Sequence, residues 1–143
     1  MNLNRVSNNL IKLIKNLFKD EEDLDITYLP KSADRHIKSN KAIYVYFDRA
    51  TFSSLNPKSF LQNKKEISFW ITLSGRSAEN NGGTFKAQSI CYDMLNKICD
   101  LAGKQTNNIS ENIELISVDE GTFSNNIYEL QLYITIHDNK MRD

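Results

Sequence analysis

The fold is decided by residues 66–102, which read EISFWITLSGRSAENNGGTFKAQSICYDMLNKICDLA. In the first part of this stretch every second residue is apolar, namely Ile67, Phe69, Ile71 and Leu73. A period of two is typical of a β-strand that turns one face toward a core. We therefore expect a half-buried strand at 67–73.

A polar turn and one amphipathic helix follow this strand. Thr84 is expected to cap the start of the helix, and Gly103 is expected to end it. Between them, apolar residues recur at three- and four-residue spacing, the period of a helix with one buried face. They are Ile90, Cys91, Met94, Leu95, Ile98, Leu101 and Ala102. We expect this helix to lie across the apolar face of the strand.

A second amphipathic helix is predicted at the start of the chain. Its apolar stripe consists of Leu3, Val6, Leu10, Leu13, Ile14 and Leu17, and its polar side carries Arg5, Lys12, Lys15 and Lys19. The acidic run at 20–25 follows. A charge run is usually a solvated connection, so we expect no metal site there.

Further strands are predicted at 42–47, 113–118 and 128–136, and 26–29 is a candidate for a short edge strand. The sequence thus predicts an α+β fold in the order α-β-β-α-β-β. It would have a mostly antiparallel sheet of about four strands, with two main helices packed on one face. The 143 residues fit a single domain, 1–143.

Charge is balanced overall but uneven along the chain. The formal net charge of zero argues against duplex nucleic acid or an anionic membrane as the main partner. Residues 31–65 hold eight basic and two acidic side chains, whereas residues 93–129 hold seven acids and two lysines. These segments are either solvated loops or surfaces that meet head to tail between copies.

No chemistry is predicted from the motifs. The sequence Gly82-Gly83-Thr84 lacks the lysine of a phosphate loop, His36 and His137 stand apart from other ligands, and Asp119-Glu120 reads as a turn. Cys91 and Cys99 are eight residues apart on one predicted helix, too far for a disulfide, and are expected to be buried. We expect no catalytic residue, no cofactor and no metal.

The longest apolar run, 42–47, is far too short to cross a membrane. With no recognisable targeting signal, the sequence predicts a soluble intracellular protein. The segment 48–65 is expected to be a long loop, and loops of this length are often functional. We take its apolar and basic residues as the candidate interface: Phe52, Leu55, Lys58, Phe60, Leu61, Lys64 and Lys65.

The order of elements resembles the tail terminator, or tail-completion, family of phages and prophages related to phage Mu. The features that carry the resemblance are the N-terminal helix, the strands at 42–47 and 67–73, the glycine-containing turn with the helix at 82–101, and the closing strand at 128–136. The resemblance covers nearly the whole chain and consists of patterning and order.

This resemblance implies a structural, non-enzymatic protein. It would form a ring, in the implied form a hexamer, that caps the tail tube, stops its growth and offers a platform for the head–tail connector. Its partners would be its own copies, the tail tube protein and the connector, with no membrane and no sequence-specific nucleic acid. It would reside in the host cytoplasm during assembly and then in the virion tail.

Two other classes remain open from the residues. One is a protein-binding adaptor or immunity-type module, monomeric or dimeric, that uses the sheet face or 48–65. The other is a small enzyme or nucleic-acid binder that uses Tyr44, Tyr46 and the basic loops, because paired tyrosines can stack bases. Tyrosine is equally common where a sheet packs against a neighbour.

Overall fold

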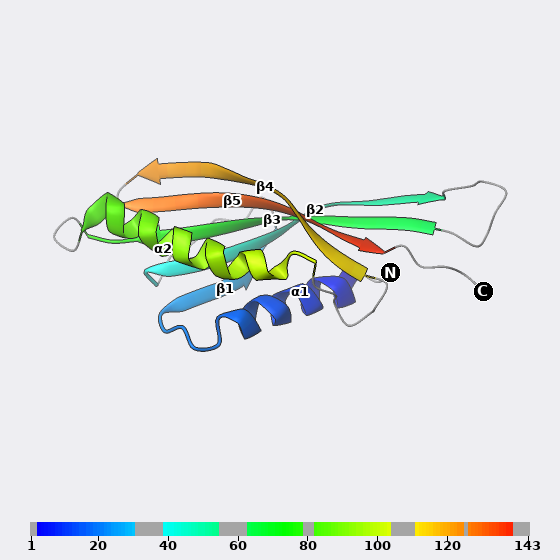
Figure 1. Ribbon diagram of the computed structural model, residues 1–143, viewed down its shortest axis with the longest axis horizontal. Coiled ribbons are helices and arrows are strands. Elements are labelled where there is room, and N and C mark those ends of the chain that lie inside the picture. Colours follow the sequence, from blue (N-terminus) through cyan, green and yellow to red (C-terminus); the bar gives the residue numbers. More distant parts are fainter. Residues whose placement is uncertain are drawn as a thin grey trace.

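The computed structural model describes residues 3–30, 39–54, 63–78, 82–103, 111–124 and 126–138. They form an α+β fold with two α-helices, a short 3-10 turn and one sheet of five strands (Figure 1). In chain order the elements are α1 (Leu3–Leu17), β1 (Leu24–Tyr28), β2 (Lys41–Ser54), β3 (Asn63–Arg76), α2 (Gly83–Ile98), η2 (Cys99–Leu101), β4 (Glu111–Ser124) and β5 (Ile127–Asp138).

The strands lie in the order β1-β2-β3-β5-β4. Only the β1–β2 pair is parallel, so the expectation of a mostly antiparallel sheet is confirmed. The expected strand number and order are wrong, since the order is α-β-β-β-α-β-β. The missing strand is β1, which pairs with β2 along its whole length, from Leu24 opposite Lys41 to Tyr28 opposite Val45.

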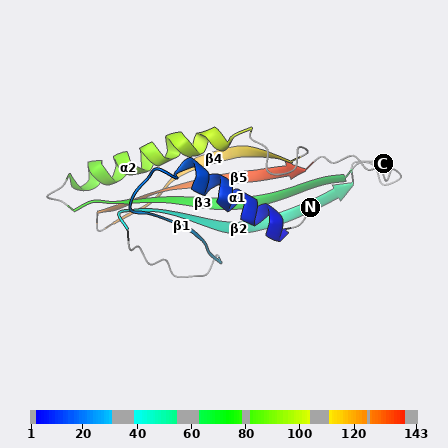
Figure 2. The same cartoon turned by 90° about the horizontal axis from the view of Figure 1, so that it is seen from below.

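Both helices pack on the same face of the sheet, as Figure 2 shows from below. The core lies between them and β3, whose residues Ile67, Phe69, Ile71 and Leu73 are almost fully buried. The stripe of α1 contributes Val6, Leu10 and Ile14, and that of α2 contributes Ala87, Cys91, Met94 and Ile98. The periodicities that predicted these elements therefore also identify the core.

Helix α2 lies close against β3 at Gly75. A Cβ atom at this position would lie 2.5 Å from the carbonyl oxygen of Ala87 and 3.1 Å from the Ile90 side chain. Real Cβ atoms do not come that close to backbone. The absence of a side chain at Gly75 thus sets how tightly the helix packs on the sheet.

The start of α2 differs from the prediction. Its N-cap is Gly82, in the left-handed region at φ 104°, and Thr84 is already inside the helix, so the predicted Thr84 cap is wrong. Glycine adopts this conformation without the steric penalty that threonine would meet. The predicted glycine stop is confirmed after η2: Gly103 has φ 80°, and its N–H donates to the carbonyl of Ile113 at 2.8 Å.

The helix-free face of the sheet carries a second, smaller cluster around Ala42, Tyr44 and Tyr46. Tyr44 is only 3% exposed and Tyr46 8%, so the structure uses both rings for packing and offers neither as a stacking platform. Nearby, the rings of Trp70 and Tyr133 meet edge to face, with centroids 4.6 Å apart.

Two strands run further than the sequence predicted. The expected turn at Asp119-Glu120-Gly121 is wrong, because β4 continues to Ser124 with an irregularity between Glu120 and Phe123 that takes up the extra residues. The expected loop at 48–65 is also wrong for the parts that the structure describes, since 48–54 belong to β2 and 63–65 to β3. The long partner strands β5 and β3 offer hydrogen bonds that local turn propensity does not outweigh.

Candidate interaction surfaces

Exposed apolar side chains gather on three surfaces of the molecule. Among the described residues, the exposed large hydrophobics are Leu3, Tyr28, Phe52, Phe85, Tyr92, Ile116, Val118 and Phe123. Five of these eight belong to α2 or β4, two to α1 or β1, and one to the β2–β3 hairpin. Scattered exposed apolar residues are ordinary, but grouping on particular elements is typical of interaction sites.

The first surface is a hairpin arm, which we define as residues 49–54 of β2 and 63–68 of β3. The two strands stay paired from Arg49 opposite Ser68 to Ser54 opposite Asn63. Strand β5 ends at Asp138 opposite Lys65, so the last pairs of the arm reach beyond the rest of the sheet (Figure 1).

A bulge at Asp48 marks the base of the arm. The register between β2 and β3 shifts between Phe47 and Arg49. The Tyr133 hydroxyl donates to Oδ2 of Asp48 at 2.6 Å, which ties the base of the arm to β5 across the intervening strand. A bulge kinks a strand and increases its twist, so this one re-aims the arm relative to the sheet.

The predicted interface residues fall partly on this arm. Phe52 lies opposite Lys65, and Phe52 is 63% exposed. Lys64 lies in β3 opposite Ser53. The remaining predicted residues lie outside the described residues: Leu55, Lys58, Phe60 and Leu61. The predicted loop is thus a strand-built arm wherever the structure describes it, and the arm presents Phe52 rather than burying it.

The second surface is the free edge of β4 together with the neighbouring side of α2. Helix α2 packs over β3 and β5, which leaves β4 beyond it (Figure 1). The ring centroid of Tyr92 in α2 lies 6.1 Å from that of Tyr128. The ring centroid of Phe123 in β4 lies 6.2 Å from the same Tyr128 centroid. Tyr92 and Phe123 are each 44% exposed, so Tyr128 forms the floor between two exposed rings.

One acid of β4 borders this β4–α2 surface. Glu120 pairs with Leu130 of the helix-side core, whereas Glu114 and Asp119 pair with Thr135 and Gln131 on the other face of the sheet. The Tyr128 hydroxyl donates to Oε2 of Glu120 at 2.9 Å, and burial is the main cause that raises the Tyr128 pKa to about 12. Tyr128 therefore keeps its proton at neutral pH and continues to hold Glu120 beside the aromatic floor.

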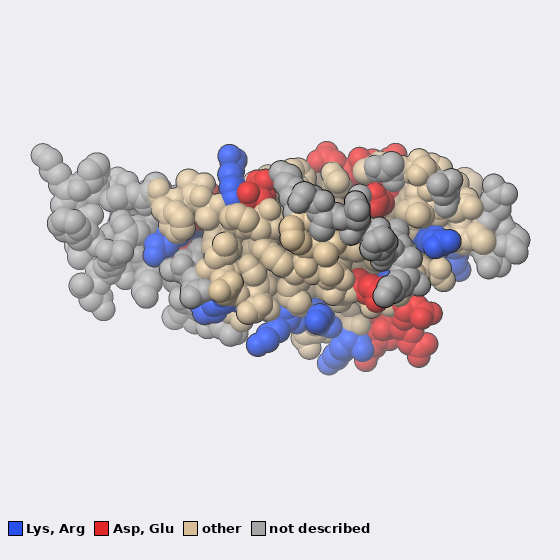
Figure 3. Space-filling view, turned by 180° about the vertical axis from the view of Figure 1, so that it is seen from behind, with Lys and Arg blue, Asp and Glu red and all other residues tan. Residues whose placement is uncertain are grey.

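The third surface is the opposite edge of the sheet, formed by α1 and β1. The basic residues of α1, Arg5, Lys12 and Lys15, follow one another at spacings of seven and three residues, which places them on one stripe, and Lys19 lies in the turn after the helix. Helix α1 contains no acidic residue. Figure 3, viewed from the helix-free side, shows acids over the β4 edge, and basic side chains beside a second acidic group along the opposite edge.

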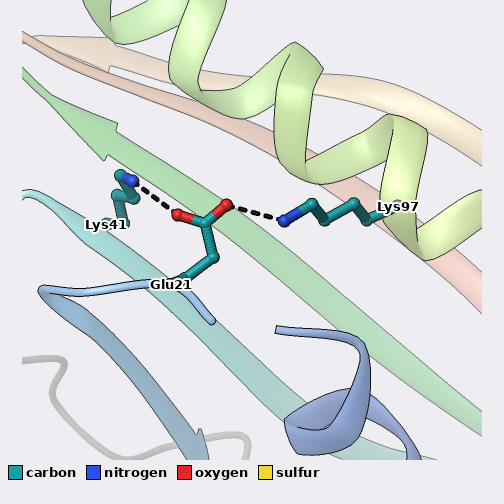
Figure 4. A network of polar contacts seen from close by, with 3 residues as sticks. All are labelled: Glu21, Lys41 and Lys97. Carbon is teal, nitrogen blue, oxygen red and sulfur yellow. Dashed lines mark hydrogen bonds and ion pairs between the residues drawn. The ribbon is translucent and has the colours of Figure 1, made fainter. Parts of the chain in front are cut away.

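One acid of the 20–25 link is used to hold the fold together. Glu21 accepts hydrogen bonds from Lys41 of β2 at 2.9 Å and from Lys97 of α2 at 2.7 Å (Figure 4). The hydrogen bond from Lys97, which has the larger effect, and the one from Lys41 lower the pKa of Glu21 to about 2. The Lys97 ammonium also lies 5.4 Å from the centre of the Phe18 ring. The link thus connects the end of α1 to β2 and α2.

The other side chains that could react or titrate are two cysteines and a histidine. The Cys91 thiol donates to the carbonyl of Tyr128 at 3.2 Å, and burial raises its pKa to about 12, so it is an inert core group. Cys99 is exposed, which corrects the expectation that both cysteines are buried; it lies where α2 gives way to η2 and its side chain leaves the core stripe. The His137 ring lies between two carboxylates. Its Nδ1 is 3.4 Å from Oε1 of Glu66, and its Nε2 is 2.5 Å from Oε2 of Glu114.

A hollow of about 590 Å³ lies beside the first half of α2, lined by Asn40, Arg76, Lys86, Ile90 and Asn126 among others. Within the described ranges, no three His, Cys, Asp or Glu residues converge in a way that could hold a metal ion. None of the helices described is long and apolar enough to cross a bilayer. His36 lies outside the described residues.

Comparison with known proteins gives a structural match only. No protein-family profile matches the sequence, and no curated protein matches it. Among solved structures, the chain is similar to the sheath/tube terminator of an extracellular contractile injection system (PVC), determined by cryo-electron microscopy in the extended state. The TM-score is 0.58 at 10% sequence identity, over 100% of this chain and 57% of that terminator.

The chain therefore has a fold found in a contractile injection system terminator and spans 57% of that protein's length. The α+β architecture expected from the resemblance to tail terminators is consistent with this match. The sequence identity is too low for individual residues to be compared between the two.

Proposed function

We propose that this protein is a structural tail terminator that caps the end of a tail tube as an oligomeric ring and stops tail growth. Residues 1–143 would act as a single terminator-like domain without catalysis. The likeness to a sheath/tube terminator supports a contractile tail or injection system, and the pattern of elements supports a relationship to the phage Mu-type family. The protein would assemble in the host cytoplasm and end in the tail of the particle.

The observation that carries this proposal is the fold match over the whole chain to a sheath/tube terminator. A fold alone does not fix a function, since one architecture can serve many roles. The distribution of exposed groups adds support, because apolar and charged residues collect on the arm and on the two sheet edges. A ring subunit needs unlike surfaces on its two sides and a third surface for the structure it caps.

The arm is the part we assign to the tube. It reaches past the end of the sheet, along the strand direction, whereas the two edges face sideways. Its exposed Phe52 supplies the apolar anchor typical of an interface centre. The other candidates follow Phe52 in the sequence, namely Leu55, Lys58, Phe60, Leu61, Lys64 and Lys65. The tail tube protein is thus the proposed partner of the arm. The head–tail connector would bind elsewhere on the ring.

The experiment is a length measurement of particles by electron microscopy in cells that produce the tail to which this protein belongs. Deleting the gene should give tubes of uncontrolled length without caps, and the wild-type gene supplied in trans should restore a narrow length distribution. Phe52→Ser should fail to restore it. Tyr28→Ser, which changes an apolar residue that is 40% exposed on β1, tests whether any exposed apolar residue has this effect.

Particles of unchanged length and unchanged ends after gene deletion would contradict the proposal. In that case the remaining class is a monomeric or dimeric binding adaptor, which also predicts no association with tubes. Restoration by Phe52→Ser with normal lengths would leave the capping role standing but remove the arm from the tube contact.

A further inference from the structure

Strand β2 has a long edge that no described strand covers. β1 pairs with β2 only from Lys41 to Val45, and one further bond runs from the N–H of Leu29 to the carbonyl of Val45. β2 itself continues to Ser54 (Figure 1). Residues 49–54, the β2 half of the arm, are therefore paired with β3 on one side and have no described strand on the other.

This edge lacks the features that protect the outer edges of β4 and β1. β4 is interrupted by two irregularities and carries the exposed acids Glu114, Asp119 and Glu120, and β1 is only five residues long. Bulges, charges and short lengths protect an edge from pairing with a further strand. In contrast, residues 50–54 of β2 read Ala-Thr-Phe-Ser-Ser and stay in regular register with β3, with neither a charge nor a proline. This part of β2 therefore offers a regular row of backbone donors and acceptors to an added strand.

Apolar side chains line this edge on the core side of the sheet. Ala50 lies opposite Ile67 of the core and Phe52 follows two residues later, so both face the side on which the helices lie. Ala50 is partly buried against the core, whereas Phe52 is 63% exposed. A strand laid along 49–54 would cover Phe52, because cross-strand neighbours on one face lie about 5 Å apart.

The accessible charges beside this edge are positive. Arg49 is exposed and Lys65 is half-buried, and within the described part of the chain neither side chain forms an ion pair or a hydrogen bond. The nearby acids Asp48, Glu66 and Asp138 are, respectively, hydrogen-bonded to a tyrosine, placed beside a histidine and buried. A second copy of the same edge would bring no acid to Arg49, so a segment that carries acids is favoured as the occupant.

We propose that the free edge of the arm, residues 49–54, binds an extended segment of a partner protein as an added β-strand. The segment carries apolar side chains at alternate positions, which pack beside Ala50 and Phe52, and acidic side chains between them, which are attracted to Arg49 and Lys65. Its backbone hydrogen bonds to β2 supply affinity, and the alternating side chains supply specificity. This inference rests on the proposed terminator function and names how the arm binds the tail tube protein.

A synthetic peptide tests the added strand. The probe is fluorescein-Glu-Val-Asp-Val-Asp-Val-Glu-amide, which alternates acids and valines, and its binding to the full chain is measured by fluorescence anisotropy. Hydrogen exchange followed by mass spectrometry should show slower exchange in 49–54 when the probe is present, because the edge amides gain acceptors. A peptide in which lysine replaces each acid should bind about tenfold or more weakly.

N-methylated probes separate an added strand from a contact made by side chains alone. In an extended peptide the N–H groups of alternate residues point to the same side, so those of the valines and those of the acids point to opposite sides. Methylating one of these two sets should abolish binding, whereas methylating the other should leave it largely intact. Equal binding of both methylated probes would overturn the strand pairing.

Variants of the chain locate the site. Arg49→Glu and Phe52→Ser should each weaken probe binding about tenfold, since they remove the charge and the apolar contact beside the edge. The matched controls are Lys86→Glu on α2 and Val118→Ser on β4, which change exposed residues outside the arm and should bind the probe like the wild type. Thermal melting checks that each variant is folded.

Failure of the probe to bind, or equal weakening by the control variants, would overturn the proposed strand. Slow exchange in 49–54 of the protein alone that is lost on dilution would assign the edge to a second copy and overturn the partner segment. The length measurement gives separate outcomes. Probe binding with unchanged particle lengths after gene deletion would keep the edge site and remove the terminator function, and normal capping without probe binding would do the reverse.

Discussion

At the scale of single residues, Glu21 links three elements through one carboxylate. It binds Lys41 and Lys97, which come from β2 and α2, and only 28% of its side chain is exposed. We expect Glu21→Gln to lower the free energy of unfolding by about 1 kcal/mol, since partly exposed ion pairs contribute on that order. Denaturant unfolding measures this change. Glu22→Gln, the exposed neighbour, is the control and should leave stability nearly unchanged.

The Glu21 contribution should also depend on pH. Its pKa is about 2 in the folded chain and 4.5 for an ordinary glutamate, so between these values the unfolded state binds more protons. Stability from Glu21 is therefore fully present above the upper value and is lost as pH falls toward the lower one. The difference between wild type and Glu21→Gln should shrink over this range in unfolding experiments. A constant difference would contradict the assigned ion pairs.

The two cysteines should differ in reactivity. Cys91 is fully buried and its pKa is raised to about 12 by burial, whereas Cys99 is exposed. Because the thiolate is the reactive form, we expect a thiol reagent to label Cys99 alone in the native protein and both cysteines after unfolding. Mass spectrometry of the labelled peptides measures this. Labelling of Cys91 in native buffer would mean that α2 is not packed as described.

Gly75 should tolerate no side chain. Its Cβ would lie 2.5 Å from a backbone carbonyl of α2, so Gly75→Ala must push the helix off the sheet. Overpacking of this kind typically costs about 1–3 kcal/mol, which chemical denaturation would detect. Ser89→Ala, on an exposed position of the same helix, is the control. Equal stability of the two variants would show that the helix and strand are not in close contact at Gly75.

At the scale of elements, the segment 55–62 that joins the two strands of the arm should be dispensable for folding. Ser54 and Asn63 are direct partners, so replacing 55–62 with Asn-Gly should close a tight hairpin. We expect the melting temperature to change little, since the described residues of α1, α2 and the sheet already build a continuous buried core. Particle-length measurement should show loss of capping. A shortened arm that still caps tubes would exclude the candidate residues in 55–62 from the interface.

The elements also show what the sequence can and cannot predict. The stripes of α1 and α2 and the alternation in β3 and β5 identify the core, because burial on one face imposes its period on the sequence. The arm and the end of β4 were missed, since polar residues and a glycine read locally as loops while partner strands impose pairing. β1 was underestimated because five residues carry little pattern.

The interaction surfaces were only partly visible in the sequence. The basic residues of α1 and the acids after Asp93 are plain in the chain, but their placement on opposite edges requires the strand order. The basic surface was expected in 31–65, yet Lys41 from that segment is bound to Glu21. Charge counts along a sequence cannot distinguish a charge engaged within the fold from one that faces outward.

At the scale of the whole molecule, the proposed ring subunit has two unlike edges and an arm that extends past the sheet along the strand direction. Lateral association that depends on charge should weaken with salt, because the screening length falls from ~10 Å at about 0.1 M to ~3 Å at about 1 M. The aromatic centre around Tyr92 and Phe123 should keep part of the attraction at high salt, since apolar contacts are not screened.

The most direct test of the terminator account is the mass of the purified protein by light scattering, across concentration, at low and high salt, and with tail tubes added. We predict a ring of several copies, alone or on tube ends, that is favoured at low salt. A protein that stays monomeric under all these conditions and does not bind tubes would contradict the account.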